Sequence, residues 1–238
     1  MKNNRVHPAA VGIRRESSHR IYVFGGRNAL AILDSCEFLD VDEGKWTLLE
    51  ARMASPRKDT CAVLLDHTTV VICGGFSYCQ PLASCESLDL VTHTFSPFPG
   101  MLEPHCDLAG VHYNGTIVVI AGRWKRNRCE QFDPTTFKWT PFAPTNQHSR
   151  WPAAVVVEGN IYATGEYTGV EVYDGSLWST VTRFPRATSA FSAVALEGKF
   201  VVINNNEKEV HIFDPATASW SCIPNMPDLR GKFVKVSF

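Results

Sequence analysis

The sequence lacks both a surplus of charge and any long apolar run. Its 238 residues carry 23 basic and 24 acidic side chains, a formal net charge of −1. Such a chain has no overall field that would draw it to nucleic acid or to an anionic membrane. The apolar run 9–13 is too short for a signal peptide, and no run approaches the roughly 20 residues of a membrane span. We therefore expect a cytoplasmic protein with no membrane partner.

The signatures of catalytic and metal centres are also missing. The sequence has no CxxC pair and no HExxH, which argues against a zinc ribbon and a metalloprotease. It has neither the GxSxG of a nucleophile elbow nor a P-loop. The eight histidines are dispersed, without paired ligand spacing. These absences predict a protein that is not an enzyme and that holds no cofactor and no metal.

Cysteine is present in eight copies, but its placement argues against disulfides. Cys36, Cys85 and Cys129 occupy one equivalent slot, each directly before a glutamate. Equivalent positions of a repeat lie on different structural units, whereas a disulfide needs α-carbons within roughly 7 Å. Cys61 and Cys73 fall inside apolar segments, where a free thiol acts as a small hydrophobe. We expect reduced, structural cysteines.

The sequence does contain an internal repeat. A glycine pair or its equivalent recurs at steps of 49, 47, 43 and 40 residues: Gly25-Gly26, Gly74-Gly75, Ala121-Gly122, Thr164-Gly165 and Asn204-Asn205. An aspartate and then an aromatic residue follow each pair: Asp40 and Trp46, Asp89 and Phe95, Asp133 and Trp139, Asp174 and Trp178, Asp214 and Trp220. Five units therefore fill most of a single domain: residues 1–52, 53–100, 101–145, 146–184 and 185–225.

Each unit has the pattern of four β-strands. In the second unit the apolar segments are 61–65, 69–73, 84–90 and 94–98. Asn114-Gly115, Glu158-Gly159 and Glu197-Gly198 join the first two strands at matching positions, and Asn-Gly favours tight hairpin turns. No helical period of useful length appears. The sequence predicts an all-β chain of five four-stranded blades arranged radially as a β-propeller.

At these residues the chain resembles the kelch repeat family, in which a hydrophobic strand ends in Gly-Gly and a Trp follows an aromatic-Asp pair by about six residues. The aromatic residue is kept as Phe132, Tyr173 and Phe213 but is Leu39 and Leu88 in the first two units. The resemblance implies a kelch-type propeller, similar to the substrate-binding half of BTB-kelch or F-box-kelch ubiquitin-ligase adaptors. It also implies structural roles for Gly25, Gly26, Gly74, Gly75, Gly122, Gly165, Trp46, Trp139, Trp178 and Trp220.

Both ends of the chain have the pattern of a first strand. Met1-x-x-x-Arg5 and Met53-x-x-x-Arg57 match Met226-x-x-x-Arg230. Segment 226–238 is either a closing strand, with residues 232–238 displacing residues 6–13, or the start of a further blade. The second alternative would give an incomplete six-bladed propeller and make the chain a piece of a longer protein. We favour the five-bladed ring.

Function on a propeller lies in the loops, because the blades keep the repeat. In the kelch family the loops after the glycine pairs, and the arginine before each first strand, line one mouth of the channel and often hold a partner peptide. We call the position of that arginine, just before each first strand, the slot. In this chain the resemblance places Arg5, Arg57, His105, Arg150 and Arg186 in the five slots. The loops contribute Arg27, Asn28, Phe76, Tyr78, Arg123, Trp124, Lys125 and Tyr167. This basic and aromatic set predicts a mouth that binds an acidic peptide or loop of a protein partner.

Other interpretations stay open. The arginines can brace neighbouring blades, and loop 123–128 can be a solvated hairpin tip. Trp124 in a basic loop could stack on single-stranded nucleic acid, although the absence of a basic surface elsewhere argues against it. The same fold can bind actin and the cytoskeleton, or process a sugar between two channel acids. The acids that recur, Glu37, Glu86, Glu130 and Glu171, have the pattern of structural residues, so a small-molecule partner is not predicted.

Overall fold

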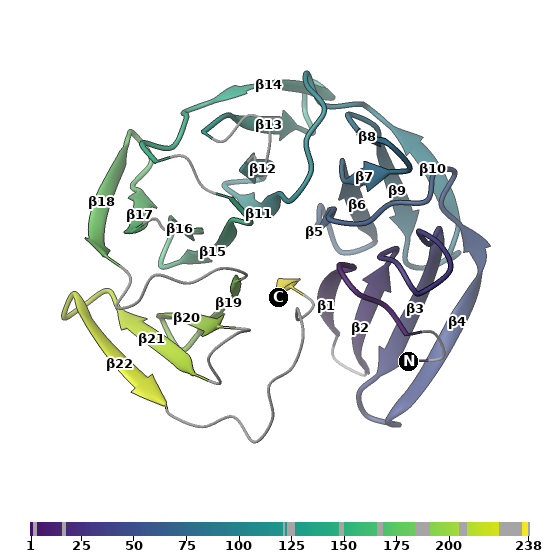
Figure 1. Ribbon diagram of the computed structural model, residues 1–238, viewed down its shortest axis with the longest axis horizontal. Coiled ribbons are helices and arrows are strands. Elements are labelled where there is room, and N and C mark those ends of the chain that lie inside the picture. Colours follow the sequence, from purple (N-terminus) through teal and green to yellow (C-terminus); the bar gives the residue numbers. More distant parts are fainter. Residues whose placement is uncertain are drawn as a thin grey trace.

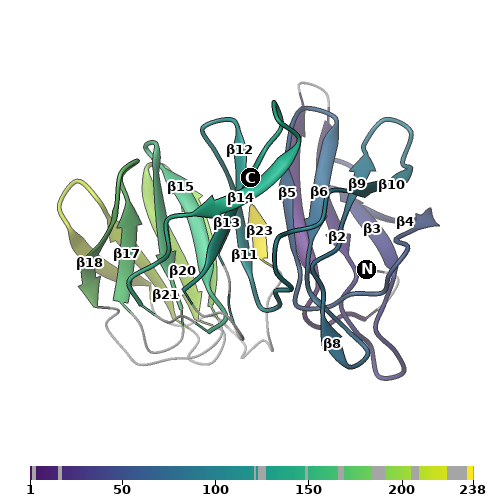
Figure 2. The same ribbon diagram turned by 90° about the horizontal axis from the view of Figure 1, so that it is seen from above.

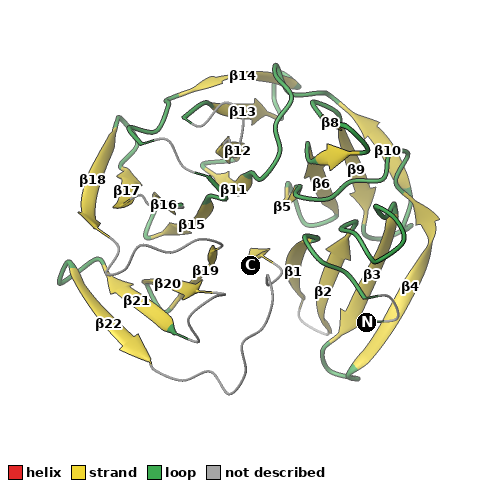
Figure 3. Ribbon diagram, in the orientation of Figure 1, coloured by secondary structure: helices red, strands yellow, loops and turns green. Residues whose placement is uncertain are grey.

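The computed structural model describes residues 1, 4–15, 18–120, 122, 127–147, 150–165, 169–183, 191–204, 209–223 and 235–237. Five sheets stand around a central axis (Figure 1). The described residues form strands, turns and loops, with no helix among them (Figure 3). The prediction of an all-β propeller with five four-stranded blades is confirmed.

The strands of each blade follow one another outward from the axis. The first blade contains β1 (Ala9–Arg15), β2 (Ser18–Phe24), β3 (Ser35–Asp40) and β4 (Lys45–Arg52). The second contains β5 (Cys61–Leu64), β6 (Thr69–Cys73), β9 (Cys85–Asp89) and β10 (Phe95–Phe98), with a small hairpin of β7 (Phe76–Ser77) and β8 (Gln80–Pro81). The third contains β11 (Ala109–Tyr113), β12 (Thr116–Ile120), β13 (Cys129–Asp133) and β14 (Lys138–Phe142). The fourth contains β15 (Ala153–Val157), β16 (Asn160–Thr164), β17 (Gly169–Tyr173) and β18 (Trp178–Arg183). The fifth contains β19 (Phe191–Leu196), β20 (Lys199–Asn204), β21 (Val210–Asp214) and β22 (Ser219–Ile223).

The turns between the first and second strands are the tight hairpins that the sequence predicts. Asn114 and Gly115 have φ of 47° and 77°, and the Glu-Gly turns at 158–159 and 197–198 have nearly the same values. Positive φ at both central residues defines the primed turn, whose twist matches that of the flanking strands. Asparagine tolerates this conformation better than most residues, and glycine adopts it at no steric cost.

The repeated aspartate shapes the turn between the third and fourth strands. In the third blade, Asp133 Oδ1 accepts the N–H of Thr135 at 2.8 Å. In the fourth, the N–H groups of Leu177 and Ser176 donate to Asp174, and these hydrogen bonds lower its pKa to about 2. The aspartate therefore recurs because each of these turns needs an acceptor at its first residue.

The repeated tryptophan joins its blade to the preceding one. Trp139 on β14 is the cross-strand partner of Phe132, and their ring centroids lie 5.5 Å apart. Its Nε1–H donates to the carbonyl of Pro99, just after the second blade, at 2.8 Å. Trp178 donates in the same way to Ala143, after the third blade, at 2.9 Å. The aromatic-Asp…Trp pattern is therefore a cross-strand pair that also holds neighbouring blades together.

The hydrophobic core lies between the blades. One cluster of buried side chains combines Tyr22 and Phe24 of the first blade with Val70 and Leu88 of the second. Similar clusters join the second blade to the third, the third to the fourth, and the fourth to the fifth. All eight cysteines are free thiols, and six of them are buried, as expected for structural cysteines.

The strand β23 (Lys235–Ser237) lies at the centre of the ring, beside β1 (Figure 1). It pairs with β1 in parallel and is the fifth strand of the first sheet. In that sheet β1 remains paired with β2. The strand β23 also contacts β19, so it bridges the first and fifth blades. Displacement of residues 6–13 by the tail therefore does not occur.

Within the described ranges, no helix combines the length and apolar character needed to cross a membrane.

Candidate functional site

One mouth of the propeller is built from the loops after the second strands and the loops before the first strands. Figure 2 shows the ring from the side, with β8 at this lower face. The two sets of loops are hydrogen-bonded to each other: Val6 forms a β-bridge with Arg27, and Lys58 forms one with Phe76. Among the described residues, this face carries the loops of the first and second blades that the sequence nominates for binding.

Each glycine pair makes room for the loop that leads into the next blade. Gly26 N–H donates to the carbonyl of Arg57 at 2.8 Å, and Gly75 N–H donates to that of His105 at 2.8 Å. A Cβ on Gly25 would collide with the carbonyl oxygen of Arg57, and one on Gly74 would lie 2.7 Å from that of His105. The glycines recur because a side chain there would separate adjacent blades.

In the first three blades, the side chains in the slots before the first strands are turned inward. Arg57 donates to Glu86 Oε1 at 2.6 Å and to the carbonyls of Gly74 and Ser84 at 3.0 and 2.9 Å. Arg5 makes the same set of contacts in the first blade, with Glu37 Oε1 at 2.7 Å. In the third blade His105 Nε2 lies 2.9 Å from Glu130 Oε1.

These contacts correct the prediction that Arg5, Arg57 and His105 bind a partner. All three are buried, and Arg57 is 0% exposed. A buried guanidinium already bound to a carboxylate and to carbonyl oxygens has no free donor face to offer a peptide. The alternative, that these residues brace adjacent blades, agrees with their positions.

Arg150 belongs to a different position of the repeat. In the first three blades the residue two places after the slot has a positive φ: His7, Asp59 and Asp107. In the fourth blade, Trp151 has the matching positive φ just before the first strand. The fourth slot therefore falls at residue 149, outside the described ranges, and Arg150 is equivalent to Lys58. The guanidinium of Arg150 lies over the Trp151 ring, 5.0 Å from its centroid. Arg123, Trp124, Lys125, Tyr167 and Arg186 also lie outside the described residues.

The loop of the first blade presents an apolar tip. Arg27 is exposed, and Leu30 is 93% exposed. Asn28 shapes this loop, because its Oδ1 accepts the N–H groups of Leu30 and Ala31 at 2.8 Å each. Arg27 and Leu30 therefore face solvent, while Asn28 holds the turn that displays them.

The loop of the second blade presents an aromatic tip. Tyr78 lies at the turn of the β7–β8 hairpin and is 77% exposed. Phe76, at the base of the hairpin, packs under Lys58, whose Nζ lies 5.2 Å from the ring centroid. In the third blade Leu102 is half-exposed, and Arg128 Nη1 lies 3.6 Å from Glu103. The sequence analysis missed Leu30, Lys58 and Leu102, because it considered only the slot residues and those directly after the glycine pairs.

The comparisons with known proteins agree with this architecture. The family model described as "Kelch motif" matches residues 17–50 and 57–102. The chain is a kelch-repeat β-propeller. The kelch propeller is 25% identical over 191 residues to Kelch-like protein 23 of Homo sapiens and of Mus musculus, covering 74% of this chain and 33% of each relative. It is 26% identical over 203 residues to the spermatocyte protein spe-26 of Caenorhabditis elegans, covering 76% of this chain and 35% of that one. It thus spans about a third of the length of these relatives.

A solved structure shares the fold of this kelch propeller. The structure of YjhT superimposes with a TM-score of 0.78 at 10% identity, covering 92% of this chain and 84% of that one. At this identity the likeness concerns the fold alone.

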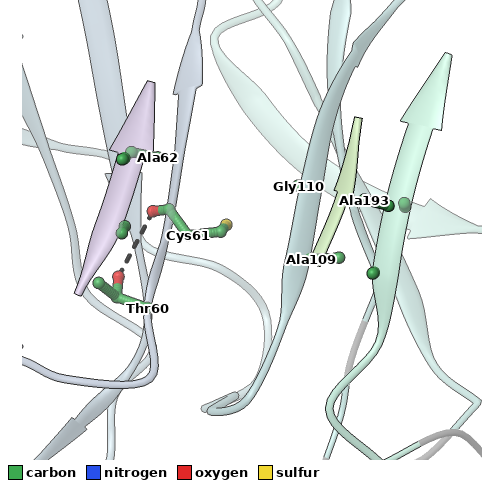
Figure 4. Close-up of a pocket in the computed structure, with 10 residues that line it drawn as sticks. Thr60, Cys61, Ala62, Ala109, Gly110 and Ala193 are labelled. Atoms are coloured by element: carbon green, nitrogen blue, oxygen red, sulfur yellow. Dashed lines mark hydrogen bonds between the residues drawn. The ribbon is translucent and has the colours of Figure 1, made fainter. Parts of the chain in front are cut away.

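The channel of the kelch propeller is narrow and lined by small side chains. Thr60, Cys61 and Ala62 face Ala109, Gly110 and Ala193 across it (Figure 4), and the space between them is about 30 Å³. A second section, of about 100 Å³, is lined mainly by valine and alanine. Among the described residues that line the two sections, none is a carboxylate. Sugar hydrolysis requires two positioned carboxylic acids, so these sections do not support it.

A partly buried cluster of His7, Lys58 and Asp59 joins the first two blades at the mouth. His7 Nδ1 lies 2.6 Å from Asp59 Oδ1, and Lys58 Nζ lies 3.2 Å from Oδ2. The N–H of Asp59 also donates to the carbonyl of His7 at 3.0 Å. Burial alone would raise the pKa of Asp59, but the hydrogen bonds and charges of His7 and Lys58 outweigh burial and lower it to about 2.

This cluster predicts a loss of stability in acid. A carboxyl whose pKa is lowered by folding stabilises the protein above its unfolded value, near 3.9, and loses that effect as the pH falls to the folded value. We expect Asp59→Asn to lower the free energy of unfolding by about 2 kcal/mol at pH 5 and by almost nothing at pH 2. Asparagine tolerates the positive φ at this position. Urea denaturation at the two pH values measures the difference.

The control is Glu43→Gln on an exposed turn, which should change stability by less than about 0.5 kcal/mol at both pH values. An effect of Asp59→Asn that is the same at pH 5 and pH 2 would contradict the charge interaction.

Proposed function

We propose that this kelch propeller is a protein-interaction module that binds an acidic peptide or loop on its mouth rim. The mouth rim is defined here as Arg27, Leu30, Lys58, Tyr78 and Leu102. The observation that carries the proposal is the exposure of large apolar side chains at this face, 93% for Leu30 and 77% for Tyr78. Apolar anchors beside cations have the composition of interaction hot spots.

The charge of the rim supports an acidic partner. Arg27 is exposed beside Leu30, and Arg128 is 62% exposed at the third blade. Arg150 occupies the position equivalent to Lys58 in the fourth blade. The whole chain is nearly neutral, so these cations form a local contrast that would favour carboxylates.

We also propose a cytoplasmic role as the substrate receptor of a ubiquitin-ligase adaptor. Support comes from the resemblance to BTB-kelch and F-box-kelch adaptors and from relatives in which the matching region is about a third of the length. Co-recovery of ubiquitin-ligase subunits with this protein from a cell lysate would test this role separately from the rim.

The rim is tested by replacing its two most exposed anchors together. The variant Leu30→Ser with Tyr78→Ser should weaken binding of a captured partner by more than about tenfold, since truncation of one hot-spot side chain commonly costs that much. Binding to immobilised acidic peptides should also weaken with rising salt, because exposed charges are screened. Affinity capture followed by titration of the recovered partner measures both effects.

The matched control is Val91→Ser with Leu177→Ser, at exposed turns between third and fourth strands. Equal affinity of wild type and rim variant for every partner would contradict the proposal, as would an equal loss in the control.

A further inference from the structure

The fifth blade departs from the repeat at its buried acidic position. Glu37, Glu86, Glu130 and Glu171 stand three residues before the turn aspartate in the first four blades, and His211 stands there in the fifth. In the second and third blades the glutamate accepts two backbone N–H groups as well as the slot side chain. Histidine in place of that carboxylate changes the chemistry of the site from an anionic acceptor to an imidazole ligand.

Two neighbouring positions hold a possible metal ligand in the fifth blade alone. The cross-strand partner of the buried acid is Leu48, Pro97, Pro141 and Thr180 in the first four blades, whereas His211 is paired with Cys222. Two residues before the acid stand Ser35, Ser84, Arg128 and Gly169, whereas Glu209 precedes His211. Residues that repeat on a propeller serve the blade, whereas this combination of three possible metal ligands occurs in one blade alone, which indicates a separate role.

The three side chains converge on one point. His211 Nε2 lies 3.1 Å from Glu209 Oε2, and the ligand atoms of all three residues lie within 4.8 Å of one another. His211 is buried, Glu209 is partly buried and Cys222 is exposed, so the cluster opens to solvent on the thiol side.

We propose that Glu209, His211 and Cys222 form a binding site for a zinc-class divalent cation. Zinc takes imidazole, thiolate and carboxylate ligands at about 2.0–2.3 Å in tetrahedral geometry, which places ligand atoms about 3.4–3.6 Å apart. Because Cys222 is exposed, its side chain can rotate to close the remaining distance. Three protein ligands leave the fourth position of the cation open to water or to another ligand.

Cobalt substitution tests the site on the full chain. One equivalent of Co²⁺ should give the visible bands of a tetrahedral complex and a near-ultraviolet thiolate-to-cobalt charge-transfer band, and Zn²⁺ should abolish both. Cys222→Ser should remove the charge-transfer band and weaken Zn²⁺ binding by more than about 100-fold. Loss of a residue that only supports a ligand weakens metal binding by at most about 100-fold, so a larger loss identifies Cys222 as a ligand. Glu209→Gln should weaken binding in the same direction and keep the charge-transfer band.

The matched control is Cys79→Ser, which removes the other exposed cysteine, at the tip of the β7–β8 hairpin. It should leave the spectrum and the affinity unchanged. The variants Cys222→Ser and Glu209→Gln alter side chains that reach solvent, so their folding can be verified by their thermal transitions without metal. A charge-transfer band that persists in Cys222→Ser, or equal Zn²⁺ affinity in all four proteins, would overturn the proposal.

Discussion

Replacing Arg57 with methionine is expected to lower the free energy of unfolding by about 3–5 kcal/mol. The guanidinium is 0% exposed and lies 2.6 Å from Glu86, itself buried. Removing it would leave the carboxylate charged without its counterion, together with two backbone carbonyls that lose their donor. Uncompensated burial of that kind costs far more than the loss of a surface pair. Denaturant unfolding measures the change.

The matched comparison is Arg52→Met, which breaks an ion pair of similar length. Arg52 Nη1 lies 2.7 Å from Asp34 Oδ1, but its side chain is 58% exposed. Exposed pairs contribute only about 0–1 kcal/mol. If Arg57→Met cost no more than Arg52→Met, the slot would not brace the blades, and the inward turn of this arginine would need another explanation.

Gly25→Ala is expected to destabilise the protein by about 2–5 kcal/mol. The residue has φ of 58°, where an alanine is strained by about 1–2 kcal/mol. Its Cβ would also collide with the carbonyl oxygen of Arg57, a backbone atom of the next blade that cannot simply rotate away. Relief requires the two blades to move apart, which disturbs the buried side chains packed between them.

Gly44→Ala separates the two contributions. Gly44 has φ of 64°, but a Cβ there would meet nothing within 4 Å. Its substitution should therefore cost only the backbone strain, about 1–2 kcal/mol. Both variants can be measured in the same thermal or urea unfolding experiment. Similar losses in the two would show that conformation alone, and not blade contact, explains the glycine pair.

The repeat itself was predictable because it is local in sequence. The turn aspartates, the Asn-Gly hairpin and the cross-strand aromatic pairs each depend on residues only a few positions apart. Short-range hydrogen bonds and pairing registers follow from residue type and spacing. Five copies in one register then specify the blades and their number.

The direction of the slot side chains was not predictable in the same way. Arg57 precedes a strand in a polar loop, where an arginine can lie in solvent or turn inward, and its spacing is the same in both cases. Burial was decided by contacts across long stretches of chain, with Glu86 and with the backbone of the second blade. Likewise, only the positive φ at Trp151 places Arg150 one residue beyond the slot.

The sequence by itself determined the all-β repeat, the turns and the loops that carry the variable residues. The tertiary structure alone decided which of those residues remain available to a partner. The physical reason is that strand pairing depends on local pattern, whereas exposure depends on contacts between residues that lie far apart in the chain. Such contacts bury Arg5, Arg57 and His105, while Leu30 and Tyr78 lie at exposed loop tips.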